Sequence, residues 1–206
     1  KNSVTFVQRS DENTKRDFPF DYELKIKYTI NGDTVTNEYI VTNTGEDKLP
    51  FVIGGHPAFN CPLAKGEKFE DYKVVFDKNI TKPCLRPDHH TGLVNVFEKF
   101  DEMHGGDTLS LVHELFEEKD ALIFENCEAK SATLIGKSGK GVKIEFQDMN
   151  NLLIWSAVGN APFVALEPWT GLASCNDEDG LFEHKRGMTV LEKDETASFK
   201  FKITMI

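Results

Sequence analysis

Apolar and polar residues alternate on both sides of the dipeptide Asn31-Gly32, which restricts this region to an antiparallel β structure. In residues 21–30, the side chains at positions 22, 24, 26, 28 and 30 are all apolar or aromatic. A period of two places such side chains on one face of a strand. Asn-Gly is a preferred dipeptide of two-residue hairpin turns, and the alternation resumes over residues 35–42. The sequence therefore predicts a β-hairpin.

The same alternation recurs over residues 71–76, 121–124, 131–135, 142–146, 152–158, 163–166 and 198–205. Residues 107–118 alone show helical spacing, with four apolar residues on one side. So many strands joined by hairpins favour an all-β fold, a large antiparallel β-sandwich. At 206 residues, an all-β chain commonly forms one unit, and we expect a single domain over residues 1–206.

Two connections carry conspicuous polar residues. Residues 137–141 read Lys-Ser-Gly-Lys-Gly, which is not a phosphate-binding motif and predicts a hairpin turn between strands. The longest connection, residues 81–106, contains prolines and histidines and is predicted to be a loop of the binding face. Its Asp88-His89-His90 segment lacks the spacing of a metal site. We therefore expect no bound metal.

The net charge excludes some classes of partner. Lysine and arginine number 24 against 34 aspartate and glutamate, a formal charge of −10. Nucleic acids and anionic membranes bind clustered cations, so this balance favours a neutral small molecule. The four cysteines are scattered, which predicts small core residues in a reducing compartment. With no signal-peptide core and no uncharged run long enough for a bilayer, we expect a cytoplasmic location.

Two segments each place one titratable side chain among small or apolar residues. Two glycines before His56 allow a tight turn, and Pro57 fixes φ after it. Glu167 ends an uncharged run that begins at residue 152, and Pro168 is expected to end the strand pairing. A poorly solvated carboxylate has a raised pKa and is suited to proton transfer. His56 and Glu167 are therefore a candidate acid and base.

These segments resemble the aldose 1-epimerase, or galactose mutarotase-like, family, and most closely its bacterial LacX-like branch. The family signature His-x-x-Phe-Asn reads His56, Phe59 and Asn60 here, and its late catalytic glutamate reads Glu167. The resemblance also covers residues 51–63, 120–124 and 180–206, and so extends over nearly the whole chain. It implies the large twisted β-supersandwich of the galactose mutarotase-like superfamily.

The resemblance also implies an isomerase that interconverts the α and β anomers of a free hexose such as galactose or glucose. Glu167 would take the proton from the anomeric hydroxyl, and His56 would protonate the ring oxygen from the opposite side of the sugar. The open-chain aldehyde would then close again as either anomer. This reaction requires no cofactor, metal, nucleotide or covalent intermediate. The implied partner is a monosaccharide, and the oligomeric state is left open.

Three further residues are candidates for sugar binding, each with a structural alternative. Trp169 either offers an apolar plate for the C–H face of a sugar or is a core aromatic residue beside a turn. Asn60 either hydrogen-bonds the sugar or braces the corner at His56. Asp120 either is the carboxylate that the family uses to accept sugar hydroxyls or is an acidic turn residue. Outside their motifs, His56 and Glu167 would themselves be a structural histidine and a surface carboxylate.

One part of the family pattern has no counterpart here. The family carries an N-terminal region whose His-Gly-Phe-Ala-Arg-like segment supplies an arginine and a histidine to the sugar site. The His-Gly pair of this chain, at residues 104–105, continues differently. We therefore expect the N-terminal strands of the sandwich to be lacking from residues 1–206.

Two rival functions follow from these observations. A sandwich that lacks part of the sugar site could be a non-catalytic sugar-binding or sensing protein. A mutarotase of sugar phosphates would instead present clustered arginines for the phosphate, whereas those of this chain are dispersed at positions 9, 16, 86 and 186. We therefore rank the sugar phosphate below the neutral hexose.

Overall fold

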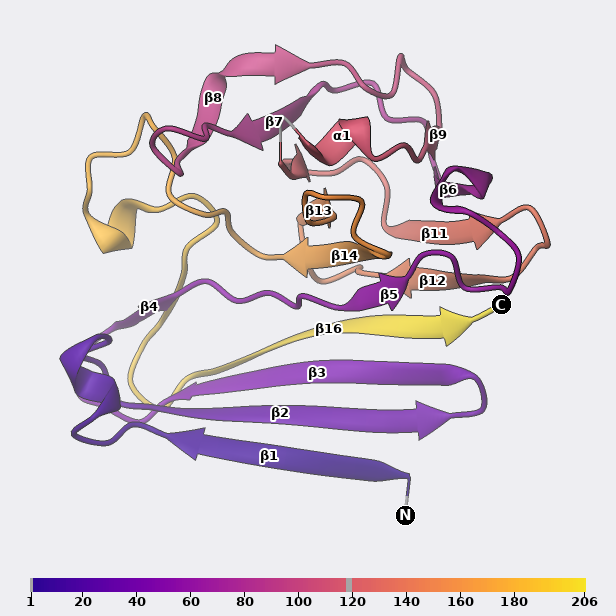
Figure 1. Ribbon diagram of the computed structural model, residues 1–206. Helices are drawn as coiled ribbons and strands as arrows, with labels where there is room; N and C mark the ends of the chain where they lie inside the picture. The colour runs from indigo at the N-terminus through magenta and orange to yellow at the C-terminus, as the bar shows by residue number, and fades with distance from the viewer. Residues whose placement is uncertain (1, 118–119) are drawn as a thin grey trace.

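The computed structural model describes residues 2–117 and 120–206. The chain folds into two large antiparallel sheets (Figure 1). The larger sheet has eight strands in the order β1 (Ser3–Arg9), β2 (Tyr22–Asn31), β3 (Thr34–Asn43), β16 (Thr196–Met205), β12 (Gly141–Glu145), β11 (Ser131–Gly136), β6 (Tyr72–Phe76) and β9 (Thr108–Ser110). The smaller sheet has six, in the order β5 (Ala58–Asn60), β14 (Phe163–Trp169), β13 (Asn151–Trp155), β10 (Leu122–Phe124), β7 (Cys84–Pro87) and β8 (Val94–Phe100). The predicted all-β antiparallel sandwich is therefore confirmed.

The remaining elements are short. Strands β4 (Leu49–Phe51) and β15 (Thr189–Leu191) pair with each other. Helical structure in the described residues consists of α1 (Glu114–Glu117) and the 3-10 turns Thr14–Arg16, Phe69–Asp71 and Phe182–His184. Within the same residues, no helix combines the length and apolar character needed to cross a membrane.

The hairpin predicted around Asn31-Gly32 is confirmed. Strands β2 and β3 pair in register from Tyr22 with Asn43 to Asn31 with Thr34. Gly32 adopts a φ of 58°, a left-handed conformation that glycine reaches without steric cost. The other segments predicted from alternation correspond to β6, β10, β11, β12, β13, β14 and β16. Residues 137–140 form the predicted turn between β11 and β12, and Gly141 begins β12.

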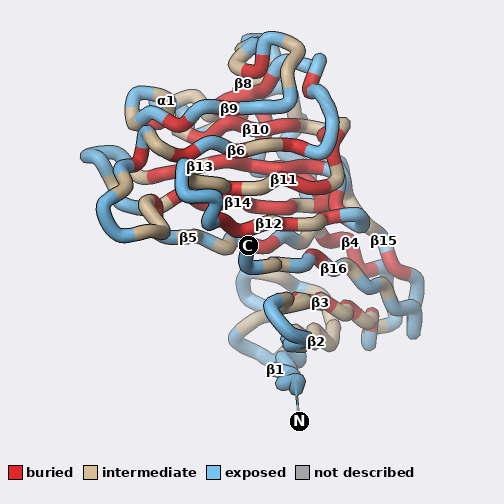
Figure 2. The backbone as a smooth tube through the Cα atoms, turned by 90° about the vertical axis from the view of Figure 1, so that its right-hand side faces the viewer, coloured by how far each residue is buried: buried red, intermediate tan, exposed pale blue. Residues whose placement is uncertain are grey.

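The main core lies between the two sheets. Val74, Leu134 and Ile144 enter it from the larger sheet, and Leu152 and Leu166 enter it from the smaller one. All five are fully buried, because alternate residues of each strand face the opposing sheet. Figure 2 shows this burial in the central strands, whereas β1 is exposed at every position.

A smaller apolar cluster covers the other face of the six-stranded sheet. Leu85, Ile123 and Leu153 lie on that face and are buried against Leu172 and Cys175 from the loop after β14. Cys175, like the other three cysteines, is a free thiol in the protein interior, as the sequence predicted. The smaller sheet is therefore apolar on both faces, and its second face lies next to the site described below.

The helix predicted over residues 107–118 is wrong for its first part. Thr108–Ser110 form β9, which pairs with β6, and α1 includes only Glu114–Glu117. Residue 118 lies outside the described residues. Leu109 and Leu111 are buried with the period of a strand, while Val112 is exposed although helical spacing placed it beside Leu109. Alternation with a period of two therefore prevailed over the helical pattern here.

Pro168 does not end the strand pairing, contrary to the sequence-based expectation. Strand β14 continues to Trp169, with Pro168 opposite Leu152 of β13. Proline lacks an N–H donor but keeps its carbonyl, which accepts a hydrogen bond from the Gly55 N–H at 3.0 Å. As a result, Glu167 lies inside the sheet rather than at the end of a strand.

The long connection over residues 81–106 is also more regular than predicted. It contains β7 and β8, which form an antiparallel hairpin with a register shift between Cys84 and Arg86. The turn of this hairpin begins at Asp88. It is stabilised because the Asp88 carboxylate accepts hydrogen bonds from the backbone N–H groups of His90 and Thr91. The structure thus presents this turn beside the second face of the smaller sheet.

Candidate active site

The backbone brings His56 and Glu167 together although 111 residues separate them (167 − 56 = 111). Strand β5 pairs with β14 so that Ala58 lies opposite Ala165. Before β5, the same register persists, because the Leu166 N–H donates to the Pro57 carbonyl at 3.1 Å. His56 therefore lies opposite Glu167, and cross-strand neighbours place their side chains on the same face.

This row of residues continues across the smaller sheet. Glu167 on β14 pairs with Leu153 on β13, which pairs with Ile123 on β10. Together with His56, these side chains form the floor of a cavity of about 430 Å³, within the usual range of small-ligand sites. The cavity is lined by His56, Pro87, Asp88, His89, Gly92, Val94, Asp120, Ala121, Ile123, Leu153, Trp155, Glu167, Trp169 and Ala173.

His56 and Glu167 are in direct contact. The Nε2 atom of His56 lies 3.3 Å from Oε1 of Glu167, and their side chains are 58% and 3% exposed. They therefore lie side by side rather than facing each other across a sugar-sized gap, as the sequence analysis had supposed. One group is open to a ligand, and the other is withdrawn into the apolar floor.

The carboxyl group of Glu167 has an altered acidity. Burial is the larger cause and the negative charge of Asp120 the smaller one, and together they raise the pKa of Glu167 to about 7. The physical cause is the floor itself, because Leu153 and Ile123 cannot solvate the charged form. A carboxyl that titrates near neutrality can act as a proton acceptor at physiological pH.

Asp120 enters the cavity from the segment between α1 and β10. Its backbone has a φ of 53°, in the left-handed region, and its N–H donates to the Phe116 carbonyl at 3.2 Å. The structure thus places the carboxylate of Asp120 in the same cavity as Glu167. This left-handed conformation directs the chain from the helix into β10.

Trp169 and Trp155 flank the pair formed by His56 and Glu167. The Nε1 atom of Trp169 donates to the Gly55 carbonyl at 3.1 Å, which fixes the backbone before His56. The ring of Trp155 meets that of His56 edge to face, with centroids 5.7 Å apart. Both tryptophans line the cavity and are only partly buried, so their rings are available to the apolar face of a ligand.

The close contact between Trp169 and Gly54 gives a testable prediction. A Cβ atom added to Gly54 would lie 2.4 Å from Cδ1 of Trp169. We expect Gly54→Ala to lower the free energy of unfolding by about 1–3 kcal/mol, the usual cost of overpacking. Urea unfolding followed by tryptophan fluorescence measures this change, because both tryptophans of the chain line the cavity.

Gly32→Asn is the matched control for that substitution. A Cβ atom added at Gly32 would meet no atom within 4 Å, and asparagine tolerates the left-handed backbone of this position. The control should unfold within about 0.5 kcal/mol of the wild type, as surface substitutions usually do. Equal stability of Gly54→Ala and the wild type would show that the corner before His56 is not tightly packed.

Asn60 does not reach the cavity. It pairs with Phe163 at the far end of β5, four residues beyond His56. At about 3.3 Å per residue, this separation is roughly 13 Å along the strand. The structure therefore brings together four of the predicted site residues, His56, Asp120, Glu167 and Trp169, and leaves Asn60 outside the cavity lining.

Three polar or aromatic residues of the cavity lining, Asp88, His89 and Trp155, are not among the candidates predicted from the sequence. Trp155 ends β13, and Asp88 and His89 lie in the turn between β7 and β8. For Asp88 and His89 the available signal was their position in a long connection with prolines, and for Trp155 it was an aromatic side chain inside the alternating segment 152–158. Among the described residues, no group of three or more histidine, cysteine, aspartate or glutamate side chains is arranged to hold a metal ion.

This chain is similar in sequence to a protein family and to curated proteins. A family model described as aldose 1-epimerase matches residues 1–204. The plasmid-encoded protein LacX of Lactococcus lactis subsp. lactis is 36% identical over 100% of this chain and 69% of its own length.

Two of the solved structures with the same fold come from lactobacilli. A galactose mutarotase related enzyme from Lactobacillus acidophilus has a TM-score of 0.90 and 27% identity, covering 100% of this chain and 68% of the other. A galactose mutarotase-like protein from Lactobacillus casei has a TM-score of 0.87 and 29% identity, covering 100% and 70%.

Proposed function

Since this chain belongs to the aldose 1-epimerase family, we propose that it is a mutarotase of a free neutral hexose such as glucose or galactose, with Glu167 as the base and His56 as the acid. The observation that carries the proposal is the contact between these two side chains inside one cavity, 3.3 Å apart. One member of the pair is buried among apolar residues and titrates near neutrality. Such a pair is the chemical requirement of ring opening.

The reaction consists of paired proton transfers. Glu167 accepts the proton of the anomeric hydroxyl, the bond between C1 and the ring oxygen breaks, and His56 donates a proton to that oxygen. Rotation about the C1–C2 bond presents the other face of the aldehyde. The reverse transfers close the ring and restore both side chains to their starting protonation states.

The side-by-side arrangement suits this chemistry. The hydroxyl oxygen and the ring oxygen are both bonded to C1, so an acid and a base that serve them need to be neighbours. A sugar that enters the cavity would take the place of the direct contact between His56 and Glu167. The rings of Trp155 and Trp169 offer apolar surfaces for its C–H face, and Asp120 offers a carboxylate for its hydroxyls.

The charge of the cavity favours a neutral sugar over a sugar phosphate. The described residues that line it include Asp88, Asp120 and Glu167 but neither lysine nor arginine. Backbone hydrogen bonds from Thr91 and His90 lower the pKa of Asp88, which keeps this carboxylate charged. A phosphate would face like charges without a cation to bind it.

Polarimetry tests the proposed function. Freshly dissolved α-glucose or α-galactose should reach its equilibrium rotation faster with the protein than in buffer. Glucose 6-phosphate should give a lower kcat/KM, because its phosphate is repelled by the cavity carboxylates. Measurable sugar binding with rates equal to buffer would instead identify a sugar-binding protein, and a preference for the phosphate would identify a sugar-phosphate mutarotase.

A further inference from the structure

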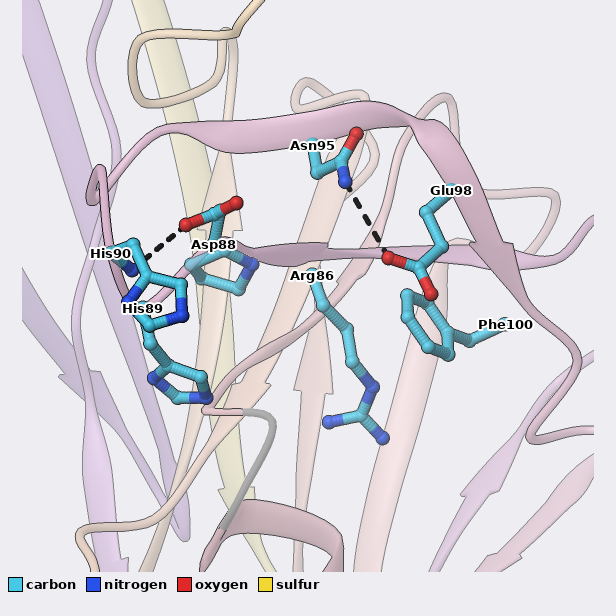
Figure 3. A pocket seen from close by; sticks show the side chains of 8 residues that line it. Arg86, Asp88, His89, His90, Asn95, Glu98 and Phe100 are labelled. Atoms are coloured by element: carbon cyan, nitrogen blue, oxygen red, sulfur yellow. Dashed lines mark hydrogen bonds between the residues drawn. The ribbon is translucent and has the colours of Figure 1, made fainter.

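A buried arginine lies behind the cavity without lining it. Arg86 on β7 is 2% exposed and occupies the wall of a neighbouring pocket (Figure 3). We propose that Arg86 is a positioning residue for the mutarotase reaction, because it holds the backbone at Asp120 so that the Asp120 carboxylate enters the cavity beside Glu167. The catalytic consequence rests on the proposed function, whereas the positioning itself can be tested without activity.

The guanidinium group of Arg86 joins three segments. Its NH1 atom donates to the Leu115 carbonyl at 2.8 Å and to the Asp120 carbonyl at 3.3 Å. Its NH2 atom donates to Oε1 of Glu102 at 2.9 Å, and its Cζ lies 5.5 Å from the centre of the Phe100 ring. Figure 3 shows the group pointing away from Asn95 and Glu98, which hydrogen-bond to each other.

These contacts explain why a charge is retained in the interior. Burial of a guanidinium is costly unless its donors are used and its charge is paired. Within the described residues, the Nε atom of Arg86 has no hydrogen-bond partner. The buried guanidinium is therefore stabilised by the three acceptors that its NH1 and NH2 atoms contact. Two of these three groups are the backbone carbonyls of Leu115, in α1, and Asp120, just before β10.

The backbone of Asp120 is fixed from both sides. Asp120 has a left-handed backbone conformation, which is unfavourable for most residue types. Its N–H donates to the Phe116 carbonyl, and its own carbonyl accepts a hydrogen bond from Arg86. Without the guanidinium, the Asp120 carbonyl would lose this partner and the peptide would be free to rotate. The carboxylate would then lose its fixed position in the cavity.

The position of Asp120 matters because its charge acts on Glu167. The titratable side chains that line the cavity around Glu167 are His56, Asp88, His89 and Asp120. Asp88 is held by the N–H groups of its own turn, and His56 is held by the corner next to β14, so neither depends on Arg86. Movement of Asp120 away from Glu167 should therefore lower the Glu167 pKa toward its ordinary value.

The test is Arg86→Lys, which keeps the positive charge but ends one bond short of the carbonyl groups. A carbon-13 NMR titration of the Glu167 carboxyl should show a lower pKa than in the wild type, shifted in the same direction as in Asp120→Asn. The acid limb of the kcat/KM profile should move to lower pH with it. In the double variant Arg86→Lys/Asp120→Asn, the Glu167 pKa should not fall further than in Asp120→Asn alone.

Asn43→Ala is the matched control. The buried Asn43 side chain also donates to two backbone carbonyls, those of Asp47 and Leu191, but it lies at the end of β3. This variant should lose stability without a change in the Glu167 titration. A Glu167 pKa that is the same in Arg86→Lys and the wild type, while Asp120→Asn lowers it, would overturn the proposal.

Two further precautions keep the test decisive. If Arg86→Lys does not fold, Phe100→Leu removes the ring beside the guanidinium without a change of charge and should also lower the Glu167 pKa. An unchanged value in that variant would overturn the proposal. Because the NMR titration needs no turnover, a wild type that fails to accelerate mutarotation would refute the function while this measurement still decides the role of Arg86.

Discussion

Glu167→Gln should slow the catalysed mutarotation by about 10²–10⁴-fold, the range for loss of a general base. The amide has nearly the same shape as the carboxyl and can occupy the same place beside His56, but it cannot accept the anomeric proton. Polarimetry with glucose or galactose measures the loss. Glu145→Gln on β12, in the other sheet, is the matched control and should keep the wild-type rate. A full rate in Glu167→Gln would exclude Glu167 as the base.

The raised pKa of Glu167 also predicts two pH dependences of opposite sign. The base acts when deprotonated, so kcat/KM should rise as pH increases through about 7. The free energy of unfolding should fall as pH rises from about 4.5 to about 7. In this interval the folded state still holds the proton on Glu167, whereas the carboxyl of the unfolded chain, with its ordinary pKa of 4.5, has lost it. The contribution of protonated Glu167 to the free energy of unfolding is complete below about pH 4.5. A pKa shift of this size corresponds to a contribution on the order of 3 kcal/mol.

Glu167→Gln should remove that pH dependence of stability. Thermal unfolding at about pH 5 and about pH 8 should therefore differ less in the variant than in the wild type. This comparison also separates a catalytic defect from a folding defect, since a well-folded variant remains stable at the higher pH. The same pH dependence in both proteins would mean that Glu167 is not the buried titrating group.

The strands of this fold were predictable wherever one face of a strand is buried and alternation is strict. The segment around Leu109 was not, because its apolar residues satisfy a helical period and a strand period at once. What decided between them was pairing with β6, which is remote in the sequence. Pro168 was misjudged for a related reason, since its carbonyl has a partner in Gly55 that no local pattern reveals.

The candidate site was predictable only in part. The motifs around His56 and Glu167 indicate both residues as candidates, but their contact depends on the register between β5 and β14. That register also separates Asn60 from the cavity, although Asn60 belongs to the same motif as His56. Arg86 had no signal in the sequence at all, because a single buried cation is defined by partners on other elements and not by its neighbours in the chain.

His56→Asn separates an enzyme from a binding protein. We expect mutarotation to slow by at least about a hundredfold, the lower end for loss of a general acid. Sugar affinity should weaken only modestly, because a proton donated mainly in the transition state contributes little to ground-state binding. Polarimetry gives the rate, and calorimetric titration with the same sugar gives the affinity.

His184→Asn is the control for that substitution. His184 also contacts a carboxylate, with its Nδ1 atom 2.7 Å from Oδ2 of Asp179, but the pair is exposed and lies outside the cavity. Loss of this imidazole should change neither rate nor affinity. If the wild type binds sugar but matches the buffer rate, and His56→Asn alters affinity alone, the cavity is a sugar receptor. A hundredfold loss of rate at nearly constant affinity would instead assign His56 to the proton transfer at the ring oxygen.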